Sequence, residues 1–146
     1  GANPLGSYAG RMDIGVVRIS GLSGTQQWAR IFGTAADDRP TAIGLDGSNV
    51  HVLGATLGTI TIPTSSSSTN GGVDELIARF ASDGTPGTYR QFGTFGDDVP
   101  GRGVLDGGKW YVPGTTTADW VGLSQDACTY HGEGDVLLSK FCVQGL

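Results

Sequence analysis

The chain has 146 residues and a formal net charge of −5, and it contains no basic cluster. This charge pattern argues against nucleic-acid binding, and the lack of a long apolar run argues against a membrane span. Glycine accounts for 26 residues, far above the usual share of about 7 %, without the three-residue period of collagen. Since these glycines separate short apolar runs, the composition predicts an all-β domain with many turns.

Short apolar runs bounded by turn residues predict the strands. In chain order, we expect strands at 13–20, 26–33, 40–46 and 49–56, then at 74–81, 87–94, 100–106 and 109–116, and finally at 135–143. Asp-Gly turns between 46 and 49 and between 106 and 109 indicate close antiparallel strands, because glycine supplies the positive φ of tight hairpins. The run T-S-S-S-S-T-N at 64–70 predicts a solvated loop, or one that carries O-linked sugar.

The chain repeats itself. The stretch R-I-F-G-T-A-A-D-D-R-P that begins at Arg30 returns at Arg90 as R-Q-F-G-T-F-G-D-D-V-P. Further landmarks recur in the same order: Gly10, Gly71 and Gly132; Asp13, Asp74 and Asp135; Arg18, Arg79 and Lys140; Leu45 and Leu105, each followed by Asp-Gly. We therefore expect a single repeat domain over 1–146, with units at about 10–70 and 71–131 and a partial unit at 132–146.

Side-chain alternation indicates how the sheets pack. Along the strands at 13–20, 74–81 and 135–143, both faces carry apolar side chains, whereas a solvated sheet alternates apolar with polar residues. Each sheet is therefore expected to be covered on both faces, as in stacked repeats. Ala42, Gly44 and Gly103 are small, as is typical of strands that crowd around a central axis.

These landmarks resemble a known repeat. The pattern G-x-x-D-x-x-x-x-[RK]-[IF], followed by F-G-T-x-x-D-D and L-D-G, is similar to the bacterial SBBP repeat over about 10–116 and 132–145. The resemblance implies a β-propeller blade of four antiparallel strands, an extracellular setting and no catalytic residues. The chain departs from the pattern where Trp28 becomes Thr88-Tyr89, and where Pro113 is expected to interrupt a strand.

Two units and one strand cannot close a ring, because propellers have roughly four to eight blades. The chain is thus a fragment of a longer propeller, a subunit that shares a ring with copies of itself, or part of an open array. With a blade order of 40–46, 49–56, 74–81 and 87–94, both ends fall inside a blade and leave strand edges that another chain can pair with. We expect an extracellular or bacterial cell-surface structural or adhesive protein, without catalytic activity, that assembles with itself into an oligomer or filament.

The alternative function is carbohydrate binding. Aromatic rings offer apolar faces to sugars, and the second half of the chain carries Trp110, Tyr111, Trp120, Tyr130 and His131. A glycan would then be the partner, with the segment around Trp120 as the ligand-facing loop. The competing interpretation is that Trp110 and Trp120 fill the core or the space between blades.

The repeated aspartate pairs are candidates for calcium ligands. Asp37 and Asp38 recur as Asp97 and Asp98, and Ca²⁺ prefers carboxylate oxygens in loops. No EF-hand or RTX spacing accompanies them. The alternative is that these carboxylates accept hydrogen bonds from nearby backbone N–H groups and define the turns between strands.

The remaining polar residues predict structural roles. The repeated Asp13/Arg18, Asp74/Arg79 and Asp135/Lys140 combinations favour salt bridges between neighbouring units. Cys128 and Cys142 are two reduced thiols or one disulfide, and the exported character of the composition favours the disulfide. No nucleophile elbow or zincin motif is present, and His51 and His131 alone cannot build a multi-histidine metal site.

Overall fold

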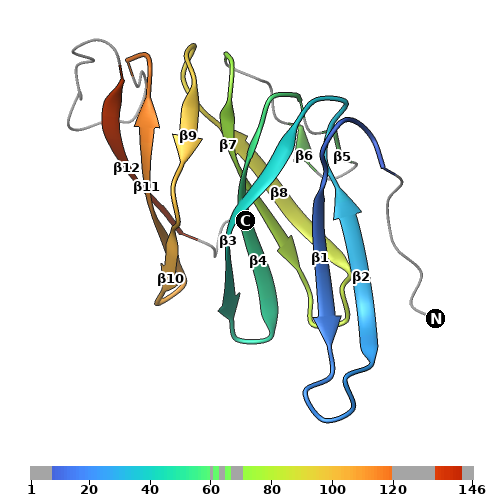
Figure 1. Ribbon diagram of the computed structural model, residues 1–146. Coiled ribbons are helices and arrows are strands. Elements are labelled where there is room, and N and C mark those ends of the chain that lie inside the picture. The colour runs from blue at the N-terminus through green and yellow to red at the C-terminus, as the bar shows by residue number, and fades with distance from the viewer. Residues whose placement is uncertain (1–7, 60, 63–64, 67–70, 120–133, 143–146) are drawn as a thin grey trace.

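The computed structural model describes residues 8–59, 61–62, 65–66, 71–119 and 134–142, and these residues form an all-β structure (Figure 1). The strands are β1 (Ile14–Ile19), β2 (Gln26–Phe32), β3 (Asp38–Asp46), β4 (Asn49–Thr56), β5 (Thr61–Ile62), β6 (Ser65–Ser66), β7 (Asp74–Phe80), β8 (Pro86–Phe92), β9 (Asp98–Pro100), β10 (Val104–Asp106), β11 (Lys109–Thr116) and β12 (Asp135–Cys142). All strand pairs are antiparallel, and no closed ring is formed by the described residues.

The central sheet has four strands in the order β3-β4-β7-β8, which confirms the strand order predicted for one repeat unit. Asp46 pairs with Asn49 across a tight turn in which Gly47 has a φ of 58°, as the Asp-Gly signal predicted. β4 and β7 are joined by the longer segment 57–73. This segment contains the β5-β6 hairpin, although the sequence predicted only a polar loop at 64–70.

The flanking sheets are parts of the same four-stranded pattern (Figure 1). The β1-β2 pair corresponds to β7-β8. On the other side, β9 and β10 together correspond to β3, β11 corresponds to β4, and β12 corresponds to β7. The first flank therefore lacks counterparts of β3 and β4 among the described residues, and the second flank lacks a counterpart of β8.

Pro113 interrupts the strand that faces it and not the strand that contains it. β11 runs without a break from Lys109 to Thr116, so the expected interruption of the strand that holds Pro113 is wrong. The facing strand is broken instead, into β9 and β10 around Gly101 and Gly103. Since proline has no N–H to donate, the ladder keeps the bond from the Gly101 N–H to the Pro113 carbonyl, at 2.6 Å, but cannot form the reciprocal bond, and here the facing strand turns away.

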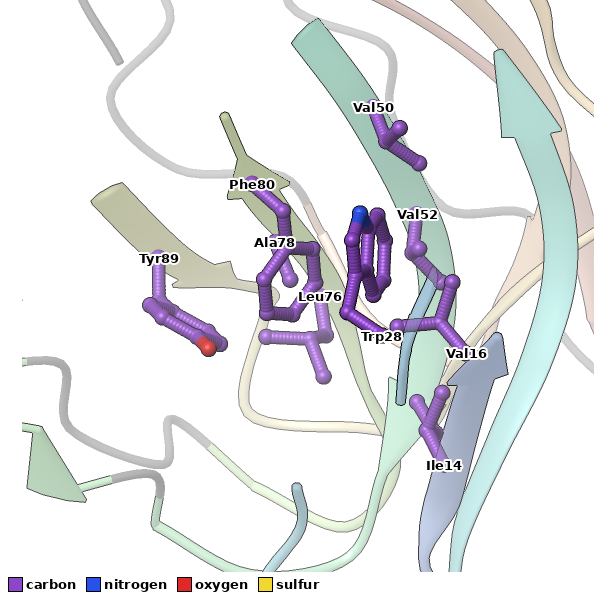
Figure 2. Close-up of a cluster of buried hydrophobic side chains, with 9 residues drawn as sticks. All are labelled: Ile14, Val16, Trp28, Val50, Val52, Leu76, Ala78, Phe80 and Tyr89. Carbon is purple, nitrogen blue, oxygen red and sulfur yellow. The ribbon is translucent and has the colours of Figure 1, made fainter. Parts of the chain in front are cut away.

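One face of the central sheet packs against β1 and β2, which we term the first interface (Figure 2). Its aromatic side chains make tilted and edge-on contacts, with ring centroids of Phe80 and Tyr89 5.8 Å apart and those of Phe32 and Phe80 5.4 Å apart. The Trp28 Nε1 donates to the Ser82 carbonyl at 2.9 Å. The cluster consists of Ile14, Val16, Trp28, Val50, Val52, Leu76, Ala78, Phe80 and Tyr89.

The opposite face packs against β10 and β11, which we term the second interface. Leu53 and Ile77 from the central sheet contact Trp110 and Val112. The sheets approach so closely that a Cβ on Gly44 would lie 2.8 Å from the Leu105 Cβ. The central sheet is thus covered on both faces, as the alternation predicted, and the small residue at Gly44 permits this approach.

The first interface should account for much of the stability. Replacing the fully buried Phe80 with alanine is expected to lower the free energy of unfolding by about 3–5 kcal/mol, because the change leaves a cavity among aromatic rings. Phe95→Ala is the matched control, since that ring is 84 % exposed and should change stability by less than about 0.5 kcal/mol. Urea denaturation of both variants gives the comparison, and equal losses would contradict this assignment of the core.

Candidate functional site

The two repeated aspartate turns, residues 33–38 and 93–98, have the same hydrogen bonds. Asp38 Oδ2 accepts from the Thr34 backbone N–H at 2.6 Å and from the Thr34 hydroxyl at 3.1 Å. Asp98 accepts the same two bonds from Thr94. Both aspartates are fully buried. These bonds match the structural interpretation, in which the carboxylate holds the turn between strands.

A second carboxylate reaches each turn. If Gly33 carried a Cβ, that atom would lie 2.6 Å from Asp13 Oδ1 and 2.7 Å from Asp38 Oδ2, so both carboxylates flank one glycine. Asp74 and Asp98 flank Gly93 in the same way. Glycine is required because any side chain would collide with both carboxylates. The repeated F-G-T-x-x-D-D motif is therefore a packed acidic corner that joins neighbouring sheets.

The first aspartate of each pair has a different role. Asp37 forms an ion pair with Arg39 at 3.9 Å, and Asp97 Oδ1 accepts from the Val73 backbone N–H at 3.0 Å. Within the described ranges, no three His, Cys, Asp or Glu side chains gather in a way that could hold a metal ion. Calcium binding by these pairs stays a prediction, and the structure supplies each of these aspartates with a protein partner instead.

Glu75 is a buried acid that the sequence analysis did not single out. It lies on β7 at the second interface, with Oε1 3.2 Å from where a Cβ of Gly114 would be. Its side chain is fully buried, and neither oxygen has a hydrogen-bond partner among the described residues. Ile14 occupies the equivalent place at the first interface, where its Cδ1 packs against Gly54. The repeat thus places a carboxyl at the second interface where it has an apolar side chain at the first.

Burial, and to a smaller extent the negative charge of Asp98, together raise the pKa of Glu75 to about 8. The side chain is therefore mostly protonated at neutral pH. An uncharged carboxyl can be accommodated in an apolar contact, whereas an ionised one beside Asp98 would carry a large desolvation and repulsion penalty. We therefore expect the second interface to weaken in alkaline conditions.

His51 is a further buried titratable group. Neither ring nitrogen has a hydrogen-bond partner in the part of the chain that the structure describes. Burial lowers the pKa of His51, the nearby Arg79 charge lowers it further, and Asp46 opposes both effects. The imidazole is therefore neutral at pH 7 and behaves as a core residue.

Salt bridges were expected between neighbouring units, but among the described residues Asp13 and Arg18 contact backbone groups instead. Asp13 Oδ2 accepts from the Ala9 N–H at 2.7 Å, and Arg18 donates to the Ser82 carbonyl. Asp74 Oδ2 accepts from the side chain of Gln91 at 2.8 Å. Asp13, Arg18 and Asp74 therefore each hold the segment that they contact.

Of the candidate sugar-binding aromatics, the structure describes Trp110 and Tyr111, which point to opposite faces of β11. Trp110 is fully buried at the second interface, so it has no ring face open to a ligand. Tyr111 points to the other side of β11, where the Lys140 ammonium lies 5.6 Å from its ring centroid. Trp120, Tyr130, His131 and Cys128 lie outside the described residues, and the Cys142 side chain is likewise not described. Carbohydrate binding and the disulfide stay predictions.

Two apolar surfaces are open. The first is a groove of about 390 Å³ beside β1, lined by Val17, Ile19, Trp28, Ile43, Leu45 and Val50. The second is the outer face of β10, β11 and β12, where Val104, Val136 and Leu138 are exposed. Contiguous exposed apolar surface of this kind is typical of interaction sites.

Comparison with known proteins adds no family: no protein-family model and no curated protein matches the chain. Among the described residues, no helix is long and apolar enough to cross a membrane. The functional inference therefore depends on the geometry of the repeat.

The buried aspartate of each pair should matter more than its neighbour. Asp38→Ala is expected to lower the free energy of unfolding by about 1.5–3 kcal/mol, because it leaves the Thr34 N–H and hydroxyl without their charged acceptor. Asp37→Ala removes an adjacent aspartate whose partner, Arg39, is largely exposed, and should cost less than about 1 kcal/mol. Thermal and urea unfolding of the two variants test this order, and the reverse order would contradict the turn assignment.

Glu75 should make stability depend on pH. Its folded pKa of about 8 lies above the ordinary value of 4.5, so the folded state binds the proton more tightly. This contribution is complete below pH 4.5 and is lost as the pH rises through 8, at up to about 1.4 kcal/mol per pH unit. Glu75→Ile, which copies Ile14, should remove this dependence and stabilise the protein most at high pH.

The control for this prediction is Glu75→Gln, which cannot titrate but keeps a polar group in the interface. We expect a flat contribution between pH 5 and 8, without the full gain of the isoleucine variant. Urea denaturation across this pH range measures the effect. A parent protein and a Glu75→Ile variant with parallel pH profiles would show that Glu75 is not the titrating group.

Proposed function

We propose that the chain is a propeller-type repeat protein, similar to the bacterial SBBP repeat, that acts as an extracellular structural or adhesive protein by assembling with copies of itself. The observation that carries the proposal is unequal exposure at equivalent positions. Apolar residues that are buried where one unit packs on the next are exposed at both open sides of the chain.

The outer face of β12 is one open side. Val136 and Leu138 are 86 % and 72 % exposed, whereas Glu75 and Ile77 at the same positions of β7 are buried in the second interface. Val136 and Leu138 are apolar, as is expected of side chains on a face that another sheet covers. No described sheet packs on Val136 and Leu138, and exposed apolar residues at positions of this kind support a contact with another repeat.

The groove beside β1 is the other open side. Leu45 is 69 % exposed, while Leu105, its equivalent in the second unit, packs against the second interface. Val17 and Ile19 are also exposed, although Ala78 and Phe80 at their positions in the next unit are fully buried. Among the described residues, no strand covers these side chains.

The two open sides are the two halves of one contact. Inside the chain, the outer face of one unit already packs on the preceding side of the next. Repetition of this contact between copies joins two different patches and is therefore heterologous, so it closes into a ring if the rotation allows and otherwise continues as a filament. Each leucine or valine that becomes buried would contribute about 1.5–3 kcal/mol, which supports assembly through several such residues.

A charge in the groove should weaken assembly. Leu45→Asp is expected to reduce the oligomer fraction strongly, because any segment that covers the groove would have to desolvate a carboxylate. Leu22→Asp is the matched control, since Leu22 is fully exposed in the turn between β1 and β2 and lines neither open side. Light scattering coupled to size exclusion measures the masses. A parent chain that stays monomeric at high concentration would refute self-assembly.

A further inference from the structure

β12 and β1 are the same structural element of two different units. β7 pairs with β4 so that Phe80 lies opposite Val50 and Ala78 opposite Val52. β12 pairs with β11 in the same register, with residue 141 opposite Trp110 and Ser139 opposite Val112. By the repeat, Ile19 and Val17 occupy these places on β1. β1 therefore has the side-chain pattern required to pair with β11.

Within the described part of the chain, β1 also lacks a second neighbouring strand, which β11 of another copy would supply. Among the described residues, β1 pairs with β2 alone, whereas its counterpart β7 lies between β4 and β8. The groove lies beside β1, between it and the β3-β4 hairpin. This is the place that the counterparts of β3 and β4 would occupy in a complete sheet, so the groove continues the first interface inward.

We propose that two copies of this chain exchange strands: β1 and β2 of one copy replace β12 on the β11 edge of the other. The product is a four-stranded sheet in the order β9/β10, β11, β1 and β2, which matches β3-β4-β7-β8. This proposal rests on the self-assembly proposed above and assigns it to β1, β2 and β11. The exchange releases β12, so in the exchanged dimer Val136 and Leu138 take no part in the contact.

The exchange preserves the pairing of β11 and adds a strand. Thr116 then faces Asp13, Val112 faces Val17 and Trp110 faces Ile19, in the register that β12 now uses. β12 brings no fourth strand among the described residues, whereas β1 arrives already paired with β2. The hydrogen bonds that β12 gives up are remade by β1, so the exchange costs little at this edge.

Charge and aromatic contacts are also conserved. Lys140 of β12 lies over the Tyr111 ring. In the exchanged sheet, Arg18 takes the position of Lys140 and brings a guanidinium, which stacks on aromatic rings at least as well as an ammonium. Arg18 already faces the central sheet of its own copy, where it donates to Ser82, so it need not change sides.

The exchange covers the exposed residues of the groove. Val17 and Ile19 turn toward the second interface of the other copy, in the places of residues 139 and 141. Val104 and Tyr111 of that copy come to lie over Ile43 and Leu45, because the equivalent contact inside the chain places the same strands against Leu105 and Trp110. Reciprocal exchange between two copies yields four complete sheets, which reaches the lower limit of about four blades for a propeller.

The test is a disulfide between copies. In a Cys128→Ser/Cys142→Ser background, a Val17→Cys chain is mixed with a Val112→Cys chain that carries a longer tag. Residues directly opposite in antiparallel strands have Cβ atoms about 4.5–5.5 Å apart, close to the range of a disulfide. We expect mild oxidation to yield a dimer with one chain of each type. A Tyr111→Cys chain is the matched control, because residue 111 points to the other face of β11 and should give at least tenfold less cross-linked product.

A second variant keeps the outcome decisive if a cysteine disturbs folding. Leu138→Asp places a charge on β12, which the exchange releases, so the oligomer mass should be retained in light scattering. Loss of the oligomer in Leu138→Asp, or its persistence without the 17–112 cross-link, would overturn strand exchange and leave assembly through sheet faces in place. A monomeric parent chain would overturn both proposals.

Discussion

The architecture depends on a strand that has no solvent face. β7 carries Leu76, Ala78 and Phe80 toward the first interface and Glu75 and Ile77 toward the second, and all five are buried. A strand of this kind cannot be stable in a single sheet, because half of its apolar surface would meet water. The neighbouring sheets are therefore a condition for the central sheet to exist, and the same requirement applies to β1 and β12, whose sequences follow β7.

The acidic corners control how neighbouring sheets meet. Each corner ties a buried aspartate to the turn that follows β2 or β8. The backbone N–H of this aspartate bonds to the segment just before β1 or β7, from Asp38 to Met12 at 2.8 Å and from Asp98 to Val73 at 2.6 Å. The chain therefore enters each new sheet from a defined point. The recurrence of these bonds in both units explains why a motif that resembles a metal-binding pair serves as a connector.

Much of the fold could be predicted because periodicity and turn residues are local. The strand expected at 74–81 is β7, from Asp74 to Phe80, and the strand expected at 49–56 is β4 with the same ends. The broken partner of β11 could not be predicted in this way, because the missing N–H of Pro113 acts across the sheet. Pairing between strands is not visible in the alternation of a single strand.

The candidate site was harder to predict than the fold. Trp110 and Tyr111 are adjacent and aromatic, yet one is buried and the other half-exposed, since consecutive side chains of a strand point to opposite faces. Glu75 was overlooked because a lone glutamate in a strand carries no signal. Its signal lay in the repeat, where Ile14 and Val136 are apolar at the same position.

The contrast between Ile14 and Glu75 makes the two interfaces respond differently to a rise in pH. The first interface is sealed by hydrocarbon alone at this position, whereas the second contains an acid that must keep its proton to remain there. In a repeat array, each repeat contacts only its neighbours, and identical repeats would have interfaces of equal stability. Here the second interface differs from the first by a buried acid. In an alkaline medium, an assembly of such chains would therefore dissociate at the second interface of every subunit.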